Sequence, residues 1–120
     1  MSLPWRTVTD TEEVEKALVS ARDHPLVLFK HSPRCGVSFH VLDDLNKALA
    51  PHADVTYLLV DVVNNRSLSQ WLVKRTGQPH QSPQLLVWQG EKIIMVRSHY
   101  AIRSKDLEEI LFSHTLHSGN

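Results

Sequence analysis

Cys35 is the residue of this chain whose side chain is best suited to covalent chemistry, and it is the only cysteine among the 120 residues. It follows a short apolar run, Leu26–Phe29, and the loop Ser32-Pro33-Arg34, and a helical pattern begins after it. The first N–H groups of a helix are unpaired and carry partial positive charge, so they favour a thiolate over a thiol. Because the thiolate is the form that attacks disulfides, we expect Cys35 to be a redox nucleophile rather than an inert buried thiol.

Ser38 stands three residues after Cys35, where a dithiol oxidoreductase would have its second cysteine. A dithiol enzyme releases its substrate when the second thiol attacks the mixed disulfide, and a serine hydroxyl cannot do this. The sequence therefore favours exchange with a mixed disulfide that an outside thiol completes. Two roles are open for Ser38: a hydrogen bond to the Cys35 thiolate, or an ordinary position on the helix surface.

Composition limits the other classes of function. The chain has 13 basic and 13 acidic residues, which gives no electrostatic reason to expect a nucleic acid or a membrane surface as partner. One cysteine and eight histidines without an HExxH motif predict no metal site. No stretch is apolar enough to span a bilayer, and the polar first ten residues, with Pro4 and Trp5, do not resemble a secretion signal. We therefore expect a cytoplasmic protein.

The order of the expected elements indicates an α/β fold. Thr9 and Glu12 form a capping box that predicts a first helix through about Arg22. The other elements are expected as follows: a strand at 26–29, a helix from 35 to 51, a strand at 55–60, a helix from 64 or 65 to 77, a hairpin of strands 85–88 and 93–96, and a helix opened by Ser104. This predicts a helix followed by β-α-β-α-β-β-α, with helices on both sides of a central mixed four-stranded sheet. We expect a single domain over residues 1–116 and a flexible tail at 117–120.

Two features narrow this prediction to a thioredoxin-like fold. One is Cys35 at a strand-to-helix junction, and the other is Ser82-Pro83 immediately before the hairpin. A proline at this place resembles the cis-proline of thioredoxin folds, which lies beside the nucleophile. The alternative is a proline that simply begins a strand.

Three sequence blocks resemble the YtxJ-type monothiol bacilliredoxins. They are Lys30-His31-Ser32-x-x-Cys35, His80-Gln81-Ser82-Pro83-Gln84 and Ser98-His99-Tyr100-x-Ile102, and the resemblance runs from about Thr9 to Phe112. It implies a thioredoxin fold and a role in the bacillithiol system, in which a cysteine removes bacillithiol from S-thiolated cytosolic proteins. We expect bacillithiol or glutathione as co-substrate, no tightly bound cofactor, and a monomer.

The resemblance also implies roles for particular residues. By position, Cys35 would be the nucleophile, Pro83 the cis-proline and Ser82 its neighbour that pairs with the substrate. From their charge rather than from the resemblance, we also expect Arg34 and Lys30 to attract the carboxylates of an anionic small thiol, each by about 0–1 kcal/mol if exposed.

Three histidines fall in the matching blocks: His31, His80 and His99. We expect them to line the site and to assist proton transfer to the leaving thiolate, and a purely structural role is open for each. The sequence departs from the family pattern at two positions. Tyr100 stands where we expect tryptophan, and it keeps an aromatic side chain. Gly36 follows Cys35, and a glycine at this position is typical of a competing family.

Other interpretations remain open. Cys35-Gly36-Val37-Ser38 differs by one residue from the Cys-Gly-Phe-Ser signature of monothiol glutaredoxins, which hold an iron–sulfur cluster between two protomers with the cysteine and glutathione. Against this, Val96-Arg97-Ser98-His99-Tyr100 has no glycine where their glutathione site needs a turn. An arsenate-reductase-like start, Pro-Arg-Cys-x-x-Ser, would need arginines that bind the oxyanion, and Phe39-His40 after Ser38 supplies none. A redox-inactive thioredoxin-like adaptor is the non-enzymatic alternative.

Overall fold

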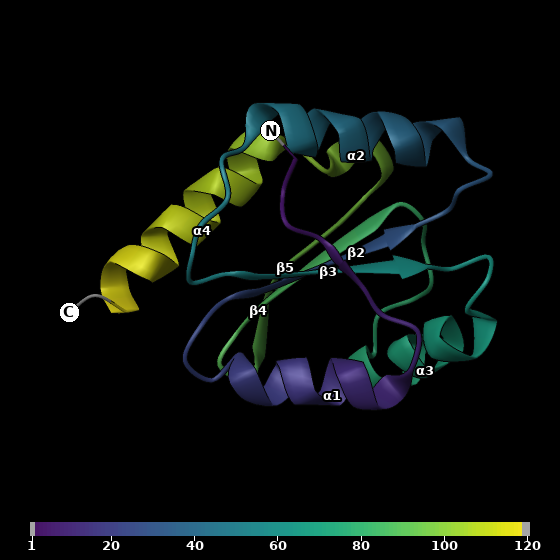
Figure 1. The fold of residues 1–120 in the computed structure, drawn as a ribbon, viewed down its shortest axis with the longest axis horizontal. Helices are drawn as coiled ribbons and strands as arrows, with labels where there is room; N and C mark the ends of the chain where they lie inside the picture. Colours follow the sequence, from purple (N-terminus) through teal and green to yellow (C-terminus); the bar gives the residue numbers. More distant parts are fainter. Residues whose placement is uncertain (1, 119–120) are drawn as a thin grey trace.

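The computed structural model describes residues 2–118 in backbone and residues 2–113 in side chains. The helices lie on both faces of the sheet, with α2 and α4 on one face and α1 and α3 on the other (Figure 1). The elements within the described residues are β1 (Arg6–Thr7), α1 (Thr11–Ser20), β2 (Leu26–His31), α2 (Gly36–Ala48), β3 (Thr56–Asp61), α3 (Arg66–Thr76), β4 (Gln84–Gln89), β5 (Lys92–Ser98), the 3-10 helix η1 (His99–Ala101) and α4 (Ser104–Ser118).

Across the described residues the sheet has five strands in the order β1-β3-β2-β4-β5. β1, β3 and β2 run parallel, and β4 and β5 run antiparallel to their neighbours. The mixed α/β arrangement is confirmed, but the predicted count of four strands is wrong. The additional strand is β1, which pairs Arg6 with Leu58 and Thr7 with Leu59 at the edge of the sheet. Two residues are too few to show a periodic pattern.

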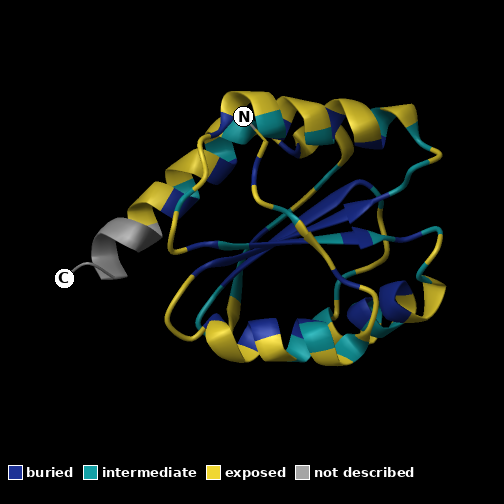
Figure 2. Cartoon of the chain, in the orientation of Figure 1, coloured by how far each residue is buried: buried dark blue, intermediate teal, exposed yellow. Residues whose placement is uncertain are grey.

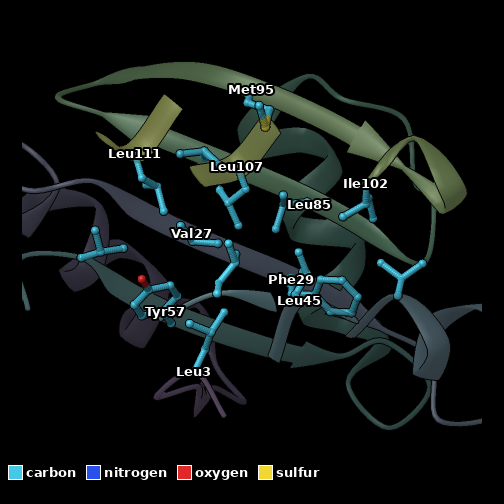
Figure 3. Close-up of a cluster of buried hydrophobic side chains, with 14 residues drawn as sticks. Leu3, Val27, Phe29, Leu45, Tyr57, Leu85, Met95, Ile102, Leu107 and Leu111 are labelled. Atoms are coloured by element: carbon cyan, nitrogen blue, oxygen red, sulfur yellow. The ribbon is translucent and has the colours of Figure 1, made fainter. Parts of the chain in front are cut away.

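The core fills both faces of the sheet because the side chains of each strand alternate between them. In β2, Val27 and Phe29 pack toward α2 and α4, whereas Leu26 and Leu28 pack toward α1 and α3. All six residues of β2 are buried (Figure 2). The apolar run Leu26–Phe29 predicts this for a central strand, whereas the burial of Lys30 and His31 was not predicted. The cluster on the α2–α4 side is drawn in Figure 3 and includes Leu3, Leu45, Tyr57, Leu85, Met95, Ile102, Leu107 and Leu111.

The segment before α1 joins α2 to the edge of the sheet. The backbone N–H of Leu3 and the indole N–H of Trp5 both donate to Asn46 Oδ1 of α2, at 3.2 and 2.8 Å. The Trp5 ring packs against Phe29 and Tyr57, with centroid distances of 5.9 and 5.6 Å. The segment then crosses the edge of the sheet toward α1 (Figure 1).

The helix termini follow the expected chemistry with one shift. Asp10, not Thr9, is the N-cap of α1, and its Oδ1 accepts from the Glu13 N–H at 2.9 Å. The predicted capping box therefore lies one residue too early. Asn65 is the N-cap residue of α3, and Gly77 ends that helix with φ 72°, a conformation that glycine adopts without strain.

The last helix begins at Ser104, as expected, and continues to Ser118. Residues 117 and 118 of the predicted tail are thus helical, and residues 119–120 lie outside the described residues. Within residues 2–118, no helix has the length and apolar character needed to cross a bilayer.

Candidate active site

Cys35 lies between the end of β2 and the start of α2 and is the N-cap residue of α2. Its backbone N–H donates to the Ser32 carbonyl at 3.1 Å, and its carbonyl accepts from the Phe39 N–H at 3.3 Å. Its side chain makes no capping hydrogen bond to any described residue, and it is half-buried. The sulfur therefore lies at the positive end of a helix, where a substrate can reach it.

Ser38 is fully buried, at 0% exposure, on the same face of α2 as Val41 and Leu45. Its Oγ accepts from the Ser32 N–H at 3.0 Å and lies 2.7 Å from His31 Nδ1. Neither role that we expected for Ser38 is observed. It is not on the helix surface, and its hydrogen-bond partners are His31 and Ser32 rather than Cys35. Ser38 therefore fixes the turn that carries Cys35.

His31 is the partner that holds Ser38. It is 7% exposed, and its ring meets the Phe39 ring edge-on at a centroid distance of 4.6 Å. Burial lowers the pKa of His31, and the nearby Asp61 carboxylate opposes this shift more weakly. His31 is therefore neutral at neutral pH, and its contacts give it a positioning role.

The second half of the site is the loop that leads into β4. The Ser82–Pro83 peptide bond is cis, and β4 begins at the next residue, Gln84. The backbone N–H of His99 donates to the Pro83 carbonyl at 3.0 Å. His99 has φ 54°, in the left-handed region that non-glycine residues enter at some cost. His99 thus contacts the proline loop through its backbone.

The structure brings the expected site residues together in two groups. Arg34 and Ser32 line one hollow together with His80 and Ser82, so the β2–α2 loop and the loop before β4 border the same space. His31 and Ser38 pair within the buried side facing α2. Among the side chains of residues 2–113, no group of three His, Cys, Asp or Glu is placed to hold a metal ion.

Lys30 is only 1% exposed, so it is not positioned to attract the carboxylates of a small thiol. Its Nζ donates to Gln84 Oε1 at 3.2 Å, and Gln84 Nε2 donates to the Pro79 carbonyl at 3.3 Å. Lys30 therefore tethers the loop that carries His80. That ring lies 3.2 Å from Ser69 Oγ. The pKa of His80 is lowered, first by desolvation and then by the positive charge of Lys30.

The burial of Lys30 predicts an unusual dependence of stability on pH. Burial lowers the Lys30 pKa from 10.5 to about 8 in the folded protein. Between those pH values the unfolded chain binds more protons, so the free energy of unfolding rises with pH. We expect a gain of up to about 3 kcal/mol, at about 1.4 kcal/mol per pKa unit. Urea unfolding from pH 7 to pH 10 should show this rise in the wild type and not in Lys30→Met.

Lys47→Met is the matched control, because Lys47 is exposed and pairs with Asp43 at 2.9 Å. It should keep the rise. If the unfolding free energies of Lys30→Met and the wild type differ by a constant amount from pH 7 to pH 10, the amine of Lys30 is not desolvated as described.

Two contributors were missed from the sequence: Gln84 and Arg66. Gln84 was part of a matching block, but its bond to Lys30 follows from the antiparallel register of β2 and β4, which pairs the two residues. Arg66 lines the same hollow as Arg34. Arg66 is the first residue of α3, the helix that follows β3, and β3 is the parallel neighbour of β2. In α/β sheets, ligands bind at the carboxyl ends of such adjacent parallel strands.

Comparison with known proteins agrees with this geometry. The family model described as monothiol bacilliredoxin BrxC matches residues 6–107. A solved structure described as a candidate oxidoreductase with a thioredoxin fold is similar at a TM-score of 0.77, with 24% identity over 88% of this chain and 91% of that chain. A thioredoxin from Nicotiana alata has a TM-score of 0.73, with 15% identity over 95% of each chain.

Thioredoxin f from spinach chloroplast has a TM-score of 0.67, with 18% identity over 93% of this chain and 92% of that chain. Identities this low show the fold alone, and the fold is the thioredoxin one. The family match covers most of the chain, including Cys35, Ser38 and Pro83. The chain therefore belongs to the monothiol bacilliredoxin BrxC family.

Proposed function

We propose that the chain removes a small thiol, bacillithiol or a similar molecule, from mixed disulfides on cytoplasmic proteins. Family membership and the oxidoreductase fold support thiol redox chemistry in general. The finer proposal depends on a contrast between two positions. Cys35 is half-buried, whereas Ser38, at the place of a second cysteine, is fully buried and hydrogen-bonded to His31 and Ser32. A site built in this way offers one sulfur and no internal resolving group.

The proposed reaction has two exchange steps. The Cys35 thiolate attacks the small-thiol sulfur of the protein mixed disulfide, a new S–S bond forms, and the protein sulfur leaves as a thiolate that takes up a proton. A second small-thiol thiolate then attacks the small-thiol sulfur on Cys35. This step releases the Cys35 thiolate and a symmetrical small-thiol disulfide. Overall, one free small thiol is consumed for each protein mixed disulfide: the protein thiol is released in reduced form, and the small thiol that it carried ends in the symmetrical disulfide.

The test follows the small thiol by intact-mass spectrometry without added free thiol. A protein with a single S-bacillithiolated or S-glutathionylated cysteine is mixed with the wild-type chain, which we propose to act as a monomer. We expect the substrate to lose the mass of the small thiol and Cys35 to gain it. An unmodified Cys35 and an unchanged substrate would instead indicate an adaptor. Brown colour on anaerobic purification would indicate a cluster carrier.

A further inference from the structure

A polar groove lies between the β2–α2 loop, which leads into Cys35, and the loop before β4. It has a volume of about 540 Å³ and is lined by three segments. These supply Ser32 and Arg34 from the β2–α2 loop, Val62 from the loop after β3 with Arg66 from the start of α3, and His80 and Ser82 from the loop before β4. A second hollow of about 260 Å³ shares Val62, Arg66 and His80 with the groove and continues along α3.

Of the described side chains, two arginines and no carboxylate line the groove. Arg34 and Arg66 are both exposed, and neither forms an ion pair with any described residue. No Asp or Glu is among the described residues that line the two hollows. The nearby Asp61 carboxylate is already held by the N–H groups of Val63 and Asn64, each at 3.0 Å. In a chain with a formal net charge of zero, such a concentration of cationic groups favours an anionic ligand.

We propose that this groove binds the carboxylate-bearing part of the small thiol, with Arg34 and Arg66 contacting the carboxylates. The inference rests on the proposed function and specifies its substrate class. Guanidinium groups bind carboxylates through paired N–H donors, which sets orientation as well as attraction. Arg34 is adjacent to the nucleophile in sequence, and Arg66, the first residue of α3, lines the same groove. A carboxylate held at Arg34 keeps the ligand close to Cys35, the next residue, whereas a neutral thiol gains nothing from either arginine.

His80 and Ser82 extend the same surface with neutral groups. Since desolvation and the Lys30 charge keep the pKa of His80 low, its ring is uncharged at neutral pH. The cationic groups of the groove are then the two arginines, with Lys30 buried behind His80 and Gln84. Removing one arginine should weaken binding roughly twofold to fivefold, the range for a solvent-exposed charge pair.

Binding is measured on the Cys35→Ser chain, which cannot exchange disulfides, so the result does not depend on turnover. The probes are S-methylbacillithiol and S-methylglutathione, each compared with its carboxylate methyl ester by NMR titration. Arg66→Gln is introduced into the Cys35→Ser chain. Arg22→Gln is the control, because Arg22 precedes the opposite end of β2 and forms only an exposed pair with Glu91.

We expect at least one free-acid probe to bind and its ester to bind more weakly. Arg66→Gln should weaken the free acid roughly twofold to fivefold and leave the ester unchanged, and Arg22→Gln should affect neither. Equal binding of acid and ester, an Arg66→Gln effect no larger than that of Arg22→Gln, or no binding of either acid would overturn the assignment. If the acids bind as expected but the wild-type chain transfers no small thiol, the groove assignment stands and the proposed function fails.

Discussion

Replacing Cys35 with serine is expected to abolish removal of the small thiol from protein mixed disulfides. Serine keeps the shape of the side chain but stays protonated and forms no disulfide, so both exchange steps lose their nucleophile. No other thiol exists in the chain to substitute for it. We expect the rate of small-thiol release from an S-thiolated protein to fall by at least about a thousandfold, as when other enzymes lose their nucleophile.

This prediction has a clear structural control. Cys35 makes no side-chain capping hydrogen bond to the described residues, so the substitution should leave the fold intact. Equal unfolding midpoints for Cys35→Ser and the wild type would show this. Small-thiol release at a tenth of the wild-type rate or more, in a folded Cys35→Ser chain, would mean that Cys35 is not the nucleophile.

Phe29→Ala should produce the largest loss of stability. Phe29 is 0% exposed in β2, it contacts the Trp5 ring, and its own ring lies 6.1 Å from that of His31. Removing a buried phenylalanine costs about 3–5 kcal/mol through lost burial and the cavity left behind. A domain of this size has only about 5–15 kcal/mol to lose. Urea unfolding should show a lower midpoint at an unchanged m-value.

The matched control is Phe39→Ala. Phe39 is the same residue type, but it is 52% exposed on the first turns of α2. Since it leaves no buried cavity, its replacement should cost less than about 1 kcal/mol. If the two substitutions lowered the unfolding free energy equally, Phe29 would not be packed in the core between β2 and α2 as described.

The fold could be predicted from sequence wherever a segment was long enough to show a pattern. The apolar run at Leu26–Phe29 gave the central strand, and the helical spacing after Cys35 gave α2. The position of the α1 cap could not be decided, because Thr9 and Asp10 are both good N-cap residues and only one of them meets the Glu13 N–H.

The candidate site was predicted less completely. Cys35 and Pro83 lie at junctions between secondary-structure elements, and such junctions can be recognised in a sequence. The position of Ser38 depends on which face of α2 turns inward, and Val41 and Leu45 already indicated that face. Lys30 lies on the same face of β2 as the buried Leu26 and Leu28, and this spacing implies that Lys30 is buried, although lysine side chains are mostly exposed. Arg66 reaches the groove only because two loops distant in sequence fold side by side.

The short strand β1 has a consequence for behaviour in a crowded solution. β3 is rich in apolar residues, and without β1 its outer edge would present unpaired N–H and C=O groups. Such an edge is a template for strands of other chains, and thus for aggregation. β1 covers the middle of that edge at Leu58 and Leu59, and the Val8 N–H adds a bond to the Leu59 carbonyl at 3.0 Å. The N-terminal segment thus protects the molecule from fibre-like association, although it contributes no residue to the site.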